Sequence, residues 1–74
     1  MIEFALKDEY IELCNLLKCA GIVGSAGAGK HLVAEGRVRV DGQPETRKTA
    51  KIRAGQIVDC DGTQVMVGAT RGQE

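Results

Sequence analysis

The sequence predicts a small α+β domain in which two helices pack on a sheet of antiparallel hairpins. Two observations carry this prediction. Apolar residues recur at helical spacing in the first third of the 74-residue chain. After Gly36 the apolar period changes to two, and two Asp-Gly dipeptides between short apolar runs mark tight hairpin turns. Helices followed by hairpins give the α+β class.

The N-terminal part predicts a strand and then the first helix. Residues 2–6 alternate weakly between apolar and polar side chains, which is typical of a short edge strand. Asp8 is the expected N-cap of a helix over residues 10–20, and Gly21 is its expected C-terminal stop. We expect this helix to supply most of the core through a stripe formed by Tyr10, Leu13, Leu17 and Ala20.

A second helix is predicted from Ser25, a strong N-cap residue, to Glu35, with Gly36 as its stop. Two helices joined by a brief turn form a helix-turn-helix-like pair. A strand over residues 37–40 follows, and its alternation places both arginines on one face and both valines on the other.

The rest of the chain predicts hairpins. Asp41-Gly42 is a turn, and Pro44 assigns the returning strand to the edge of the sheet. Residues 47–53 are expected to form a basic loop with local extended structure. A second hairpin follows, with strands over residues 56–60 and 63–67 around Asp61-Gly62.

The length limits what the chain can do. A single domain is expected over residues 1–67, followed by a flexible tail over residues 68–74. A chain this short buries only about 60% of its unfolded surface, which leaves no room for a catalytic cleft between two lobes. No apolar run approaches the ~20 residues of a membrane span, and the start does not resemble a signal peptide. We expect a cytoplasmic, non-enzymatic protein.

Cysteine and histidine spacing gives little support for a metal site. The chain has three cysteines, an odd number at wide spacing, which argues against a disulfide framework. The possible ligands show no C-x-x-C spacing of the kind that holds zinc; they are Cys14, Cys19, His31 and Cys60. We therefore expect reduced cysteines, no metal and no cofactor.

The formal net charge is zero, yet the charges are zoned along the chain. The start is acidic, with Glu3, Asp8, Glu9 and Glu12. Residues 30–53 hold a concentration of lysine and arginine. A protein charged in this way can bind a polyanion on one face and be repelled on the other. The alternative is an ordinary solvated surface on which cations solubilise and protect exposed strands.

The segment from Gly24 to His31 nearly matches the phosphate-loop pattern of nucleotide hydrolases. His31 stands where that pattern requires a hydroxyl residue, and no buried strand precedes the segment, so nucleotide hydrolysis is not expected. Gly27 and Gly29 have two compatible explanations. Their amides could bind a phosphate at a helix start with Lys30, or the glycines could allow close packing.

The planar guanidinium of arginine and the ammonium of lysine both donate hydrogen bonds to phosphate oxygens. The candidate binding residues are Ser25, Gly27, Lys30, Arg37, Arg39, Arg47, Lys48, Lys51 and Arg53. The two aromatic residues, Phe4 and Tyr10, lie in the acidic part of the chain, and Tyr10 is expected in the core. Because binders of single strands stack bases on aromatic side chains, this composition favours recognition of the backbone and shape of a structured nucleic acid.

The order of these segments resembles the alpha-L RNA-binding motif, the module of ribosomal protein S4. The resemblance covers residues 10–67 and rests on Ser25, Leu32, Gly36, the run Arg37-Val38-Arg39-Val40-Asp41-Gly42, and the run Arg53-Ala54-Gly55-Gln56-Ile57-Val58. Among members, the chain is most similar to stand-alone bacterial proteins that contain this domain and little else.

The resemblance implies two helices on a small sheet, with structured RNA of the ribosomal or transfer class bound at the second helix and the adjoining hairpin. Low sequence preference is expected, because phosphate contacts position a protein without specifying sequence. The alternative is a protein–protein interaction module within a ribonucleoprotein complex, which docks through the acidic face.

Overall fold

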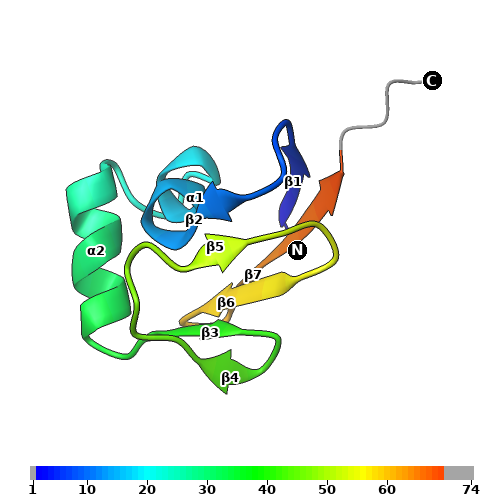
Figure 1. The fold of residues 1–74 in the computed structure, drawn as a ribbon. Coiled ribbons are helices and arrows are strands. Elements are labelled where there is room, and N and C mark those ends of the chain that lie inside the picture. The colour runs from blue at the N-terminus through cyan, green and yellow to red at the C-terminus, as the bar shows by residue number, and fades with distance from the viewer. Residues whose placement is uncertain (1, 70–74) are drawn as a thin grey trace.

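The computed structural model describes residues 2–69. Within these described residues, two helices and seven strands follow one another (Figure 1). They are β1 (Ile2–Leu6), β2 (Ile11–Glu12), α1 (Leu13–Cys19), α2 (Ala26–Ala34), β3 (Val38–Val40), β4 (Gln43–Pro44), β5 (Lys51–Ile52), β6 (Ile57–Cys60) and β7 (Thr63–Ala69). The expected α+β class is confirmed. Neither helix is long and apolar enough to cross a membrane.

The main sheet has five strands in the order β1-β7-β6-β3-β4, and β2 pairs with β5 in a separate ladder. All pairs are antiparallel except β1 with β7, which run parallel, so the sheet is mixed rather than wholly antiparallel. The predicted edge positions of residues 2–6 and of Pro44 are confirmed. The parallel pair consists of the first strand and the last strand, which come from opposite ends of the described residues (Figure 1).

Both predicted Asp-Gly turns are present. Asp41 and Gly42 have φ angles of 53° and 82°, and Asp61 and Gly62 have φ angles of 52° and 90°. Two consecutive residues at positive φ match the twist of hairpin strands, and Asp-Gly is one of the few dipeptides that adopt this backbone readily. The Asp41 carboxylate also accepts a hydrogen bond from the Ile57 amide at 2.9 Å, which ties the first hairpin to β6.

The core lies between α1 and the inner face of the sheet. Alternation along the strands turns one set of apolar side chains inward, and α1 covers them with three fully buried leucines. The residues of this cluster include Leu13, Leu16, Leu17, Val38, Ile52, Val58, Val65 and Val67. α2 contributes Val33, and the segment between β4 and β5 runs along α2 before it reaches β5 (Figure 1).

The first helix differs from its prediction. It begins at Leu13, and Asp8 does not cap it. The Leu13 and Cys14 amides instead donate to the backbone carbonyls of Ala50 (2.9 Å) and Lys48 (3.1 Å). A remote loop therefore satisfies amides that a local side chain was expected to satisfy. Tyr10 lies outside the helix and is 37% exposed, so its expected place in the core was wrong.

The second helix agrees with its prediction. Ser25 is the N-cap, and its hydroxyl oxygen accepts a hydrogen bond from the Ala28 amide at 3.1 Å. The helix ends at Ala34, and Gly36 leaves it with a φ of 77°. Glycine adopts this left-handed conformation without strain, which explains why the chain can turn here into β3.

The last strand is longer than predicted. Gly68 and Ala69 belong to β7 and pair with Ala5 and Leu6 of β1, although the sequence placed them in a flexible tail. The pairing extends because β1 offers a second strand to hydrogen-bond with. Residues 70–74, the rest of that predicted tail, lie outside the described residues.

The three cysteines are free. Cys14 and Cys60 are buried and Cys19 is exposed. Burial raises the pKa of the Cys60 thiol, which makes it less reactive. Among residues 2–69, no three side chains of histidine, cysteine, aspartate or glutamate come together in a way that could hold a metal ion.

Candidate nucleic-acid interface

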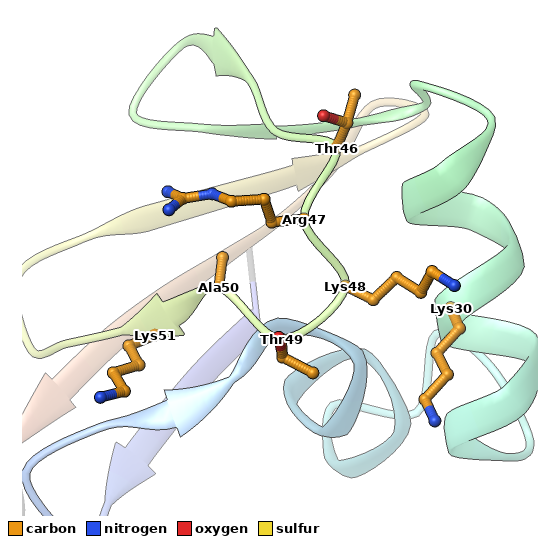
Figure 2. A pocket seen from close by; sticks show the side chains of 7 residues that line it. All are labelled: Lys30, Thr46, Arg47, Lys48, Thr49, Ala50 and Lys51. Atoms are coloured by element: carbon orange, nitrogen blue, oxygen red, sulfur yellow. The ribbon is translucent and has the colours of Figure 1, made fainter.

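A wide, open hollow of about 840 Å³ lies between α2 and the segment that joins β4 to β5 (Figure 2). Its lining, which we call the basic hollow, consists of Lys30, Thr46, Arg47, Lys48, Thr49, Ala50 and Lys51. The lining contains cationic and hydroxyl side chains and no carboxylate. The structure therefore brings together predicted site residues from two separate parts of the chain.

The backbone of this segment is fixed from behind. The carbonyls of Lys48 and Ala50 accept the first two amides of α1, and the Ala50 amide donates to the Arg47 carbonyl at 3.2 Å. Ala50 is only 7% exposed and belongs to the core, whereas Lys48 and Thr49 are exposed. Lys48 extends from the segment toward α2, on which Lys30 lies (Figure 2). The lysines are thus presented from an anchored loop and a helix.

Arg47 is neutralised within its own loop. Its Nε lies 3.1 Å from Glu45 Oε2, and its backbone amide donates to the same oxygen at 2.9 Å. These hydrogen bonds lower the pKa of Glu45, because the arginine stabilises the ionised carboxylate. Among residues 2–69, the ion pairs involve no lysine. Lys30, Lys48 and Lys51 therefore supply the charge of the basic hollow that no ion pair among these described residues neutralises, although Glu12 is opposite Lys51 in the β2–β5 pair.

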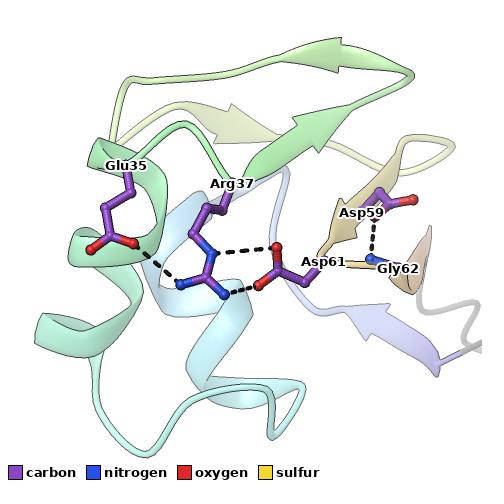
Figure 3. Close-up of polar contacts among 5 residues, drawn as sticks. All are labelled: Glu35, Arg37, Asp59, Asp61 and Gly62. Atoms are coloured by element: carbon purple, nitrogen blue, oxygen red, sulfur yellow. Dashed lines mark hydrogen bonds and ion pairs between the residues drawn. The ribbon is translucent and has the colours of Figure 1, made fainter.

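Arg37 and Arg39 line a different hollow, together with Asp59 and Asp61. The Arg37 guanidinium lies between Asp61 and Glu35 (Figure 3). Its Nε donates to Asp61 Oδ1 at 3.3 Å, a second nitrogen donates to Asp61 Oδ2, and a third donates to Glu35 Oε1 at 3.3 Å.

The hydrogen bonds that Arg37 donates to Asp61 and Glu35 raise the pKa of its guanidinium. Arg39 sits directly opposite Asp59 across the β3–β6 pair. Carboxylates therefore hold the Arg37 guanidinium and one faces Arg39 across the strand pair, and the structure does not bring these arginines to the basic hollow. Counting cations along the sequence does not reveal these facing carboxylates, because Asp59 and Asp61 come from a strand and turn about 20 residues away.

The two glycines of the second helix have different roles. A Cβ on Gly29 would lie 2.8 Å from the Cys14 carbonyl oxygen, so Gly29 allows α2 to pack closely on α1. A Cβ on Gly27 would meet only the Ser25 hydroxyl, at 3.8 Å. Because residues 26–34 are helical, the segment that resembled a phosphate loop is not a loop. Gly27 lies one turn before Lys30 on the same helix face.

Arg53 lies outside the basic hollow, next to an aromatic residue that the sequence analysis placed in the core. The Cζ of Arg53 is 5.7 Å from the centroid of the Tyr10 ring, and the Nζ of Lys51 is 4.9 Å from it. Tyr10 is spaced from Leu13 and Leu17 as a helical stripe requires, so no local signal distinguishes it from a core residue.

The acidic residues lie elsewhere on the surface. Asp8 and Glu12 line one hollow with Tyr10, Ile11 and Asn15, whereas Glu3 borders another beside Met66. None of them lines the basic hollow. These acidic residues are thus kept apart from the lining of the basic hollow, whereas Arg37 and Arg39 share a hollow with Asp59 and Asp61.

A model of the S4 domain family matches residues 4–68. The chain belongs to the S4 domain family. A relative of this chain, YbcJ of Escherichia coli K12, is 49% identical over 70 residues, which cover 93% of this chain and 100% of YbcJ. RlbA of Bacillus subtilis, named as a probable ribosome maturation protein, is 31% identical over 58 residues, 78% of this chain and 82% of RlbA.

Solved structures agree with this S4 domain assignment. The solution structure of Escherichia coli YbcJ, described as revealing an αL motif involved in RNA binding, matches with a TM-score of 0.74 and 48% identity over 93% of this chain and 89% of YbcJ. Ribosomal protein S4e of Thermoplasma acidophilum matches with a TM-score of 0.66 and 19% identity over 78% of this chain and 31% of S4e, which shows a shared fold. The predicted alpha-L resemblance is confirmed.

Proposed function

We propose that this S4 domain is a non-catalytic RNA-binding protein that holds the phosphate backbone of a structured RNA in the basic hollow. The observation that carries the proposal is the composition of that hollow, in which Lys30, Lys48 and Lys51 face solvent with no carboxylate in the lining. The RNA-binding description of the αL motif in YbcJ supports it.

The chemistry of the lining favours backbone contacts. A lysine ammonium is a point charge with three donors that can meet phosphate oxygens from several directions. The hydroxyls of Thr46 and Thr49 add donors of the kind that phosphates also accept. Such contacts carry no sequence information, so sequence preference should be low and the shape of the RNA should decide where the protein binds.

The start of α2 extends the same surface. Gly27 and Lys30 share a helix face, and the first amides of a helix favour an anion. We therefore include Ser25 and Gly27 in the proposed interface. Arg47 takes part once a phosphate replaces Glu45 at its exposed guanidinium, and Arg53 continues the surface past Lys51. Arg37 and Arg39 would contribute only if the RNA displaced the carboxylates around them.

The proposed ligand is ribosomal or transfer RNA in the cytoplasm, in line with the ribosome maturation role in the name of RlbA. Binding should depend steeply on salt, because each phosphate neutralised releases counterions. Two or three contacts predict a log–log slope of about −2 to −3, from roughly −0.9 per duplex phosphate. Fluorescence anisotropy with a labelled RNA hairpin at several salt concentrations measures this slope. An affinity that does not change with salt contradicts the proposal.

A second candidate function is docking of a basic protein on the acidic side, favoured by the hollow that Asp8 and Glu12 share. Charge reversal separates the two candidates. Changing Glu9 and Glu12 to lysine should abolish capture of a basic protein partner and spare RNA binding, whereas changing Lys30 and Lys48 to glutamate should do the opposite.

A further inference from the structure

We infer that Tyr10 is a stacking platform for one unpaired base of the RNA whose backbone lies in the basic hollow. The inference rests on the proposed function and adds to it a second kind of contact. It concerns a residue whose type and position suggested only a core role.

Strand pairing places the ring beside two cations. Ile11 of β2 pairs with Ile52 of β5, and the antiparallel register then sets Tyr10 against Arg53. Ile52 is buried, and the side chains on either side of it, Lys51 and Arg53, point to the opposite side of the strand and reach the ring. Tyr10 is 37% exposed and both cations lie over its ring, so an aromatic, negatively charged ligand would stack on the ring surface that they leave open.

Lys51 connects this ring to the proposed phosphate site. It lines the basic hollow, and its Nζ is also 4.9 Å from the centroid of Tyr10. The Arg53 amide donates to the Gln56 side-chain oxygen at 2.7 Å, which fixes the backbone at the far end of this path. An RNA strand that leaves the hollow along Lys51 therefore meets Tyr10 next.

Electrostatics decides which part of the nucleotide reaches the ring. Beyond Tyr10 lies a hollow of about 500 Å³ that is also lined by Asp8, Ile11, Glu12 and Asn15. Its carboxylates repel a phosphate and leave a neutral base unaffected. Lys51 and Arg53 therefore hold the phosphate, although Glu12 lies opposite Lys51 in the β2–β5 pair, and the base, if it is unpaired, covers the ring. A base inside a duplex has its faces occupied and cannot do so.

Tyrosine fluorescence tests this inference on the unaltered protein. Tyr10 is the only tyrosine and the chain has no tryptophan, so the intrinsic emission reports on this ring alone. The probes are an RNA hairpin with an unpaired loop and the same hairpin with abasic loop nucleotides, which keeps every phosphate. The intact loop should quench the emission and the abasic loop should not. Equal quenching by both, or none by either when both are bound, overturns the inference.

Affinity provides an independent measurement. Tyr10→Ala should weaken binding of the intact hairpin by about 10-fold, a typical effect of one lost base–aromatic stack, and leave the affinity for the abasic hairpin unchanged. Tyr10→Phe keeps the ring and should bind both hairpins like the original protein. Equal losses for the two hairpins would mean that Tyr10 only supports the fold.

Failure of the inference and failure of the proposed function look different. If both hairpins bind equally well, with a steep salt dependence that Lys48→Glu reduces, the proposed function stands and Tyr10 is not a stacking residue. If neither hairpin binds, the proposed function is wrong and the inference falls with it.

Discussion

Changing Lys30 and Lys48 together to glutamate should weaken binding of a structured RNA by about 60-fold or more near 0.1 M salt. Each phosphate contact contributes roughly eightfold between 1 M and 0.1 M salt, so two lost contacts give an effect of this order. Both side chains are exposed, and the structure assigns them no hydrogen bond that holds the fold. Titration of a labelled RNA hairpin measures the loss.

Two controls show whether position or total charge is responsible. Lys7 and Lys18 are exposed and lie outside the basic hollow, so changing both to glutamate alters the net charge equally. This variant should bind within a few-fold of the original protein. Arg37→Ala should also bind normally, because Asp61 and Glu35 already neutralise that guanidinium. Losses of similar size in the two double variants would show that total charge, and not the hollow, controls binding.

Gly29→Ala should lower the free energy of unfolding by about 1–3 kcal/mol, the usual result of forcing extra atoms into a packed interface. The new Cβ would lie 2.8 Å from the Cys14 carbonyl oxygen, which is backbone and cannot move aside without shifting α1. Any gain in helix propensity is smaller than this repulsion. Urea denaturation, followed by circular dichroism, measures the change.

Gly27→Ala is the matched control and should have the opposite sign. Its Cβ would meet only the Ser25 hydroxyl at 3.8 Å, so the gain in helix propensity, up to about 1 kcal/mol, is not opposed. Destabilisation by both substitutions would mean that the two glycines are needed for backbone freedom, and the distinction between packing and open surface would then be wrong.

Features set by neighbouring residues could be predicted from the sequence. Both Asp-Gly turns, the Ser25 cap and the end of the second helix at Gly36 follow from side chains and backbone preferences within a few residues. The α+β class follows from the change of apolar period at the same glycine. These signals need no knowledge of distant contacts.

Features set by distant residues could not be predicted. The parallel pairing of β1 with β7, and the capping of α1 by the carbonyls of Lys48 and Ala50, join parts of the chain that are far apart. Because residues 11–12 pair with β5, the first helix begins at Leu13 and does not include Tyr10. A local pattern cannot distinguish a ring in a helical stripe from one just ahead of the helix.

The candidate site was predicted in part for the same reason. Lysines from residues 30–51 were expected on one surface, and the structure brings Lys30, Lys48 and Lys51 to one hollow. The arginines of the first hairpin were expected beside them, but Asp61 folds back onto Arg37 from the second hairpin. Spacing along a strand shows that two side chains share a face and does not show which charges face them.

Mapping the RNA contact on the protein tests the central proposal most directly. Amide and side-chain NMR signals should be recorded while a structured RNA hairpin is titrated into the labelled protein. The largest shifts should fall on Lys30 and on residues 46–51, with little change at Arg37 and Asp61. Shifts centred on Arg37, Arg39 and Asp61, with Lys30 and Lys48 unaffected, would contradict the assignment of RNA binding to the basic hollow.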